Sequence, residues 1–143
     1  MDKNKELSAS ITLVNDKLKF SANVEGNPPF PIDYIPPLGD NLGYTSLELL
    51  LLSLSSCVGS AVLTFLRKMN KTIETCVISS NGIRNDEHPT GFREIYTLIE
   101  IKSSDVTVED MNKVIQLAED KYCPVYSMIK GNVSVNINFK IER

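Results

Sequence analysis

The chain has one histidine and three cysteines in 143 residues, and this scarcity excludes several kinds of site. No two possible ligands stand at the close spacing of a zinc site. The single imidazole, His88, has no orienting partner at a spacing typical of a cysteine protease. No glycine-rich phosphate loop is present either. The sequence therefore predicts neither a bound metal nor a cofactor.

The charge balance is also unremarkable, with a formal net charge of −3. Such a balance argues against nucleic acid or an anionic membrane as the main partner. A hydrophobic content of 42% and a charged content of 23% are ordinary for a soluble globular protein. We therefore expect a single domain over residues 1–143 that binds no nucleic acid.

The few cysteines also bear on the compartment. Three are too few for a disulfide scaffold, and the odd number leaves at least one free thiol. Residues 1–10 are polar and lack the apolar core of a signal peptide. We therefore expect a reducing, cytoplasmic setting, where cysteine pairs are more often catalytic than structural.

Periodicity gives the order of the elements. Alternating apolar residues predict strands within 10–35, and a loop rich in proline and glycine follows. Capping boxes at Thr45–Glu48 and Thr107–Asp110 predict two helix starts. The remaining patterns complete an α+β domain. The later elements are expected as a central helix over 45–69, a hairpin over 73–101, a helix over 107–122, a short helix over 124–130 and a final strand over 132–142.

The central helix is unusual because residues 49–66 carry no formal charge. Eighteen such residues reach the lower limit for a membrane span. Four serines and Gly59 interrupt the run, however, and a helix that is apolar nearly all round is more often the buried centre of a soluble protein. We therefore expect no membrane span, and expect a second subunit to help cover the helix.

Two cysteines lie in the segments that say most about function. Cys57 lies in the middle of the apolar run, where the helix dipole has little effect, and buried cysteines often act only as small hydrophobes. Cys123 precedes Pro124 and is expected as the N-cap of the short helix, whose free N–H groups favour a thiolate. Local sequence thus favours Cys123 as the reactive thiol and leaves a packing role open for both. Cys76, inside a strand pattern, is expected to pack in the core.

Glu48 has a structural explanation that needs no chemistry, because the capping box accounts for it. A regular helix also places it about 13 Å along the axis from Cys57 and on the opposite side. Direct contact between the two would need a break in the helix.

Both cysteine segments resemble one family. TSLELLLLSLSSC, ending at Cys57, resembles the central helix of the OsmC/Ohr proteins, the osmotically inducible proteins and organic hydroperoxide reductases. KYCPVYS, around Cys123, and the following KGNV resemble their second cysteine motif and final strand. The match in order and spacing covers about residues 30–143.

The resemblance implies an OsmC-like fold, with antiparallel sheets around a long central buried helix, in an intertwined homodimer. It implies a thiol-dependent peroxidase that reduces small organic hydroperoxides in oxidative stress defence. Cys57 would become a sulfenate, Cys123 would form a disulfide with it, and an external dithiol would reduce that disulfide. Glu48 is the third candidate catalytic residue, since the family holds an activating arginine with a glutamate.

Two features depart from the hydroperoxidase pattern. The family's arginine comes from the N-terminal strands, whereas this chain has none before Arg67. The family's glutamate stands ten residues before the cysteine, a position that Leu47 occupies here. The candidates to replace the arginine are Arg67, Arg84 and Arg93.

The segment 85–89, which contains His88, resembles an OsmC-like side branch of the family. These departures leave an alternative function open. In that alternative the chain is a catalytically degenerate OsmC-like dimer that binds a small apolar ligand at its interface.

Overall fold

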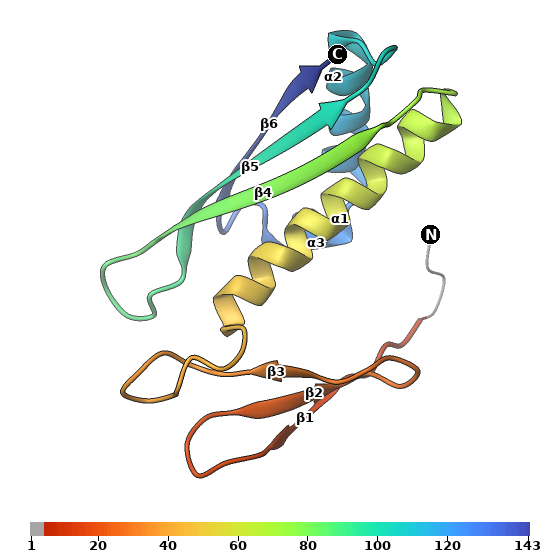
Figure 1. Cartoon of the computed structure of the whole chain (residues 1–143). Helices are drawn as coiled ribbons and strands as arrows, with labels where there is room; N and C mark the ends of the chain where they lie inside the picture. Colours follow the sequence, from red (N-terminus) through yellow and green to blue (C-terminus); the bar gives the residue numbers. More distant parts are fainter. Residues whose placement is uncertain (1–4) are drawn as a thin grey trace. The chain divides into compact units, whose positions relative to one another are not determined.

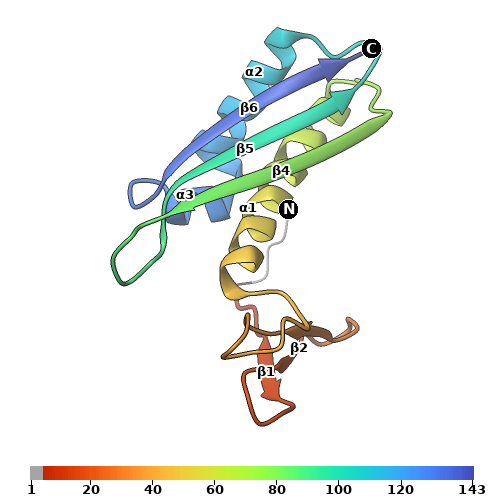
Figure 2. The ribbon, with the colours of Figure 1, turned by 60° about the vertical axis from the view of Figure 1, so that its left-hand side comes forward.

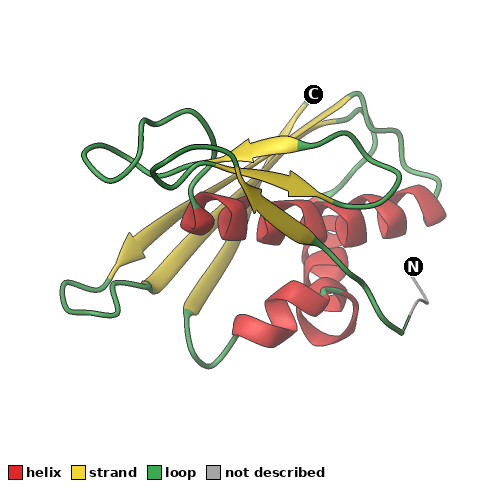
Figure 3. Cartoon of the chain, turned by 90° about the horizontal axis from the view of Figure 1, so that it is seen from below, coloured by secondary structure: helices red, strands yellow, loops and turns green. Residues whose placement is uncertain are grey.

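The computed structural model describes residues 5–143 and has an α+β fold with two three-stranded sheets (Figures 1 and 3). The first four residues of the polar N-terminal segment lie outside the described residues. The chain divides into two compact units, Met1–Leu49 and Leu50–Arg143, which are described separately below. One domain over the whole chain stays a prediction.

The first unit contains an antiparallel meander of β1 (Ser10–Leu13), β2 (Phe20–Asn23) and β3 (Phe30–Ile32). Ile11, Ala22 and Phe30 are aligned across the three strands. Because side chains alternate along a strand, the apolar residues share one face and the polar residues the other. The unit leaves this apolar face largely open, with Ile11 54% and Leu13 53% exposed. The sheet therefore needs a covering surface. The apolar face consists of Ile11, Leu13, Phe20, Ala22, Phe30 and Ile32.

Helix α1 (Ser46–Lys68) has defined signals at both ends. The Thr45 N–H donates to the Glu48 carboxylate at 2.9 Å, and the Glu48 N–H donates to the Thr45 hydroxyl at 3.3 Å. This capping box confirms the predicted helix start. At the other end Asn70 has a φ of 60°, and the Lys71 N–H reaches back to the Leu66 carbonyl at 3.0 Å. Such a left-handed residue is a common helix terminator.

The second sheet has the order β4 (Thr75–Arg84), β5 (Phe92–Lys102), β6 (Ser134–Glu142). β4 and β5 form the expected antiparallel hairpin, but β6 runs parallel to β5. The prediction of purely antiparallel sheets is wrong for this pair. The reason is the helical crossover between β5 and β6, which returns the chain to the same end of the sheet. The crossover consists of α2 (Val108–Leu117), the π-helical turn η1 (Ala118–Tyr122) and α3 (Pro124–Ile129).

The core of this unit lies between the sheet and the helices, which are on the same side of it (Figure 2). Inward residues of β5 such as Ile95 and Ile99 are fully buried, as are Leu54, Val58 and Leu66 of α1. In the part of the chain that is described, α1 is the one helix with the length and composition to cross a membrane, and 39% of that stretch is buried inside the chain. Partial burial against a sheet is typical of the core helix of a globular protein.

The second helical segment differs from the single helix predicted over 107–122. Thr107 and Asp110 form the predicted capping box, but the α-helix ends at Leu117. The next turn is wider because the Cys123 N–H bonds the Ala118 carbonyl, five residues back, at 3.0 Å. Pro124 has no N–H to continue the pattern, and α3 begins there with Cys123 as its N-cap.

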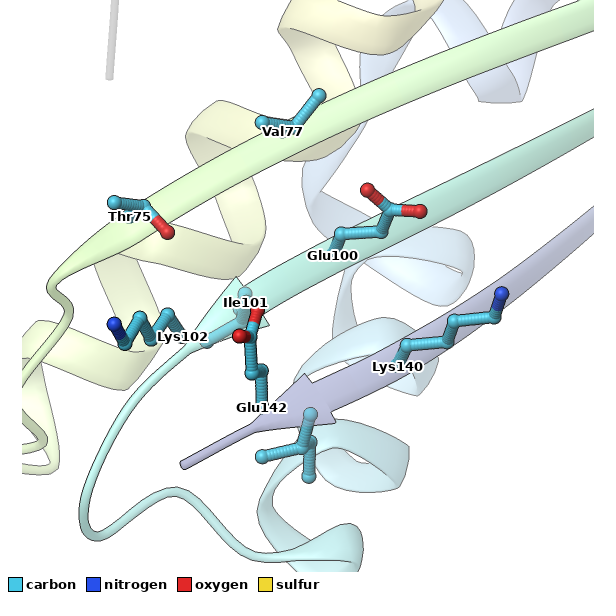
Figure 4. A pocket seen from close by; sticks show the side chains of 8 residues that line it. Thr75, Val77, Glu100, Ile101, Lys102, Lys140 and Glu142 are labelled. Atoms are coloured by element: carbon cyan, nitrogen blue, oxygen red, sulfur yellow. The ribbon is translucent and has the colours of Figure 1, made fainter.

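The other face of the second sheet is polar and carries a shallow hollow of about 390 Å³ (Figure 4). Glu100 is paired with Lys140, and Lys102 with Glu142, so opposite charges lie across neighbouring strands. Cross-strand pairing accounts for these side chains, and the hollow has no cysteine among its lining residues. We therefore place no site there.

Candidate functional site

The second unit brings Cys57 and Cys123 together. Cys57 is half-buried near the middle of α1, whereas Cys123 is only 2% exposed at the junction of η1 and α3. After burial, the neighbouring Cys57 thiol is the largest cause of the raised pKa of Cys123. The two thiols, 66 positions apart in sequence, are therefore close enough to act on each other, and both are free.

The environment of Cys123 favours the protonated thiol. Burial and the Cys57 thiol raise the pKa of Cys123 to about 12. The Tyr126 N–H, which donates to the Cys123 sulfur at 3.4 Å, and the Val125 N–H act in the opposite direction but are outweighed. The expectation from local sequence, that the helix start favours a thiolate here, is wrong. α3 has six residues and a weak dipole, and desolvation of the charged form is the larger effect.

The arrangement therefore contains two unlike thiols. One is partly accessible on the flank of a helix, and the other is enclosed and held protonated. A pair of this kind is suited to a sequence in which the accessible sulfur reacts first and the enclosed one reacts only with its neighbour.

An aromatic pair that the sequence analysis missed joins α1 to the turn that precedes Cys123. Phe65, two helical turns after Cys57, packs against Tyr122 with ring centroids 4.7 Å apart. The Lys68 ammonium lies 5.4 Å from the Phe65 ring, and the Lys121 ammonium lies 5.5 Å from the Tyr122 ring. The pair ties α1 to the turn that carries Cys123. The pair joins two separate elements, so no local pattern in the sequence indicates it.

The third cysteine lies elsewhere. Cys76 is half-buried on β4 opposite Ile101. Burial raises the pKa of Cys76, and the Arg67 guanidinium partly opposes this. Within residues 5–143 no three histidine, cysteine or acidic side chains are grouped closely enough to hold a metal ion.

The candidate arginines interact with other groups. Arg67 acts on Cys76, and Arg93 acts on Tyr96. The Arg84 guanidinium bonds the Thr90 carbonyl at 2.6 Å and its hydroxyl, within the loop that contains His88. None of these contacts involves the cysteine pair.

The Glu48 carboxylate is occupied by the helix start. It accepts hydrogen bonds from both the N–H and the hydroxyl of Thr45, each at 2.9 Å. These bonds lower the pKa of Glu48, with burial opposing them.

We expect Glu48→Gln to lower the melting temperature by a few degrees and to change the rate at which iodoacetamide alkylates Cys57 less than twofold. The loss of a capping contact is a stability effect of this size. Thr45→Val, which removes the other half of the box, is the control and should match it. A tenfold loss of rate in Glu48→Gln alone would give the carboxylate a chemical role.

A row of three hydroxyls is a further feature that the sequence analysis missed. The Ser55 and Ser80 oxygens are 2.7 Å apart, and the Ser80 and Thr97 oxygens are 2.8 Å apart. The signal was available, because Ser80 and Thr97 occupy inward positions of β4 and β5 where apolar residues are expected.

The family model for OsmC-like proteins matches residues 39–138, which include both cysteines of the pair. No curated protein matches the chain closely enough to be compared. Among solved structures, a hypothetical protein from Aquifex aeolicus has a TM-score of 0.84 at 22% identity, over 97% of this chain and 98% of its own. These similarities concern the fold.

Two further structures carry informative names. An OsmC-like protein from Mycoplasma pneumoniae has a TM-score of 0.83 at 20% identity, over 98% of this chain and 99% of its own. The organic hydroperoxide resistance protein OhrB of Bacillus subtilis has a TM-score of 0.64 at 19% identity, over 94% and 98%. With the family match over 100 of its 143 residues, the chain belongs to the OsmC-like protein family.

Proposed function

We propose that the chain is a cytoplasmic, thiol-dependent peroxidase that reduces organic hydroperoxides and contributes to oxidative stress defence. The observation that carries the proposal is the adjacent pair of unlike thiols, half-buried Cys57 and enclosed Cys123. Membership of the OsmC-like family and the names of hydroperoxide resistance proteins with the same fold support a redox role.

In the proposed reaction the Cys57 thiolate attacks the terminal oxygen of the hydroperoxide. The O–O bond breaks, the alkoxide takes up a proton and leaves as an alcohol, and Cys57 becomes a sulfenic acid. The Cys123 sulfur then displaces hydroxide from Cys57, and with the thiol proton this leaves as water. The disulfide that results is reduced by an external dithiol, which supplies two electrons and two protons.

Glu48 enters this proposal as a positioning residue. Its carboxylate fixes the start of the helix that carries Cys57 and does not itself exchange protons with the substrate.

The direct test mixes purified protein with tert-butyl hydroperoxide and follows hydroperoxide, alcohol and free thiols together. We expect one alcohol and the loss of two thiols per chain in the absence of reductant, and continuous turnover with a dithiol. If Cys57 remains a thiol under excess hydroperoxide, the proposal is wrong.

We also propose that the chain functions as a homodimer. The apolar face of the β1–β3 sheet is open within its own unit, and α1 carries a hollow of about 390 Å³ lined largely by small polar side chains. An open apolar sheet face of this kind is typical of subunit interfaces. The hollow is lined by Ser55, Ser56, Gly59, Ser60, Leu63, Thr64, Arg67 and Ile78.

Light scattering is expected to give twice the mass of one chain for the native protein. Phe30→Lys, on the apolar face, should shift the mass toward that of one chain, because a buried charge is costly at an interface. Asn138→Lys, on the polar face of the second sheet, is the matched control and should remain dimeric. A native protein with the mass of one chain would contradict the proposal.

The alternative is a degenerate dimer that binds a small apolar ligand without turnover. It is favoured by the interactions of the three candidate arginines, none of which involves the cysteine pair. Rapid hydroperoxide consumption that depends on Cys57 would exclude it.

A further inference from the structure

The hydroxyl row of Ser55, Ser80 and Thr97 connects α1 to the sheet through its core. Thr97 is 1% exposed, and its hydroxyl reaches Ser55 only through Ser80. No buried side-chain nitrogen or oxygen in the described part of the chain lacks a hydrogen-bond partner, so the row is satisfied. Polar groups at such positions contribute less to stability than packed apolar ones, which suggests a different role.

The other contacts between α1 and the sheet are apolar. The buried face of the helix is made of small and medium aliphatic side chains, and at Gly59 the helix lies close enough to β4 that a Cβ would collide with Ile78. Such contacts determine how closely the helix and the sheet pack, whereas a hydrogen bond also requires a particular direction between its donor and its acceptor. In the described residues, the Ser55–Ser80 bond is the one directional side-chain contact from α1 to the sheet.

The axial position of α1 matters because the two thiols are on different supports. Cys57 moves with α1, whereas Cys123 is held by the crossover that packs against β6. A disulfide requires a narrow range of Cα and Cβ distances, and one residue of helix slip is 1.5 Å.

We propose that Ser80, bonded to Ser55 and Thr97, is a positioning residue that sets the register of α1 and so keeps the Cys57 sulfur within bonding reach of Cys123. This inference rests on the proposed function, since it assigns the row to the disulfide step. In this role the hydroxyl row affects the equilibrium between the dithiol and the disulfide, and not only the stability of the fold.

The test measures that equilibrium without peroxide. The dimeric full-length protein is equilibrated with reduced and oxidised dithiothreitol, so that two protein thiols give up two electrons and two protons to the reagent disulfide. We expect Ser80→Ala to lower the equilibrium constant for the Cys57–Cys123 disulfide by more than twofold and by at most about fivefold, the factor reached if the free energy of one typical hydrogen bond is lost from the disulfide form alone.

Ile78→Val is the matched control, because it removes one methyl group at the same helix–sheet contact and leaves the row intact. We expect its equilibrium constant to stay within twofold of the native value. If Ser80→Ala stays within twofold as well, or if the native protein forms no disulfide, the inference is overturned.

A second pair of variants tests the register role of the hydroxyl row if Ser80→Ala does not fold. Thr97→Val removes the hydroxyl at nearly constant shape, and Thr97→Ser keeps the hydroxyl and removes the methyl group. We expect the equilibrium constant to fall only in Thr97→Val, and equal values in both would overturn the inference. A native protein that forms the disulfide but consumes no hydroperoxide would overturn the proposed function and leave the register role intact.

Discussion

Cys57→Ser is expected to slow hydroperoxide consumption by at least about 1,000-fold, since removal of a reacting nucleophile has effects of this size or larger. The hydroxyl of serine is not ionised at neutral pH and does not accept the oxygen atom that a thiolate removes. Initial rates with tert-butyl hydroperoxide and a dithiol, measured at equal protein concentration, provide the comparison.

Two variants make this result specific. Cys76→Ser changes the half-buried cysteine outside the pair and should retain the native rate. Without the dithiol, Cys123→Ser should release one alcohol per chain and then stop, with a sulfenic acid at Cys57 that dimedone traps. Full activity in Cys57→Ser, or an equal loss in Cys76→Ser, would contradict the role given to Cys57.

Alkylation of Cys123 by iodoacetamide at pH 8 is expected to be on the order of 1,000-fold slower than that of a small free thiol. With a pKa of about 12, only about one Cys123 in 10,000 is ionised at this pH, against about a quarter of a thiol with the ordinary pKa of about 8.5. The rate should rise about tenfold per pH unit from pH 8 to 10. Peptide mapping by mass spectrometry after timed quenching measures it for each cysteine.

The raised pKa of Cys123 also makes the free energy of unfolding depend on pH. The folded state raises the pKa of Cys123, so it holds the thiol proton more tightly than the unfolded chain does. The stabilisation is present in full below about pH 8.5 and is lost as the pH rises toward 12. Cys123→Ala should flatten this decline, and an unchanged slope, or fast alkylation of the native protein, would show that the thiol is not enclosed.

The parts of the fold that sequence predicts are those determined by a few neighbouring residues. Each capping box satisfies free backbone groups at its own helix start, Thr45 with Glu48 and Thr107 with Asp110. Both boxes can therefore be predicted without tertiary information. The position of Cys123 directly before Pro124 likewise predicts the start of α3. The alternation of β6 predicts a strand but says nothing of its direction.

The parts that sequence does not predict depend on contacts between distant residues. The parallel pairing of β6, the π-helical turn and the hydroxyl row each arise when separate elements pack together. The raised pKa of Cys123 belongs to the same group, because burial and Cys57 cause it and both come from the tertiary structure. Family resemblance paired the two cysteines where local signals did not.

The parallel pairing of β5 and β6 bears on how the chain folds. Glu94 pairs with Ser134 and Lys102 with Glu142, so every pair in this ladder joins residues forty positions apart. The β4–β5 hairpin closes over a short loop, but β6 must wait until the crossover is synthesised and the larger loop is closed. Cys123 lies in that crossover, so the burial that raises its pKa requires the crossover to pack. Packing of the crossover is then also the step at which the two cysteines become chemically distinct.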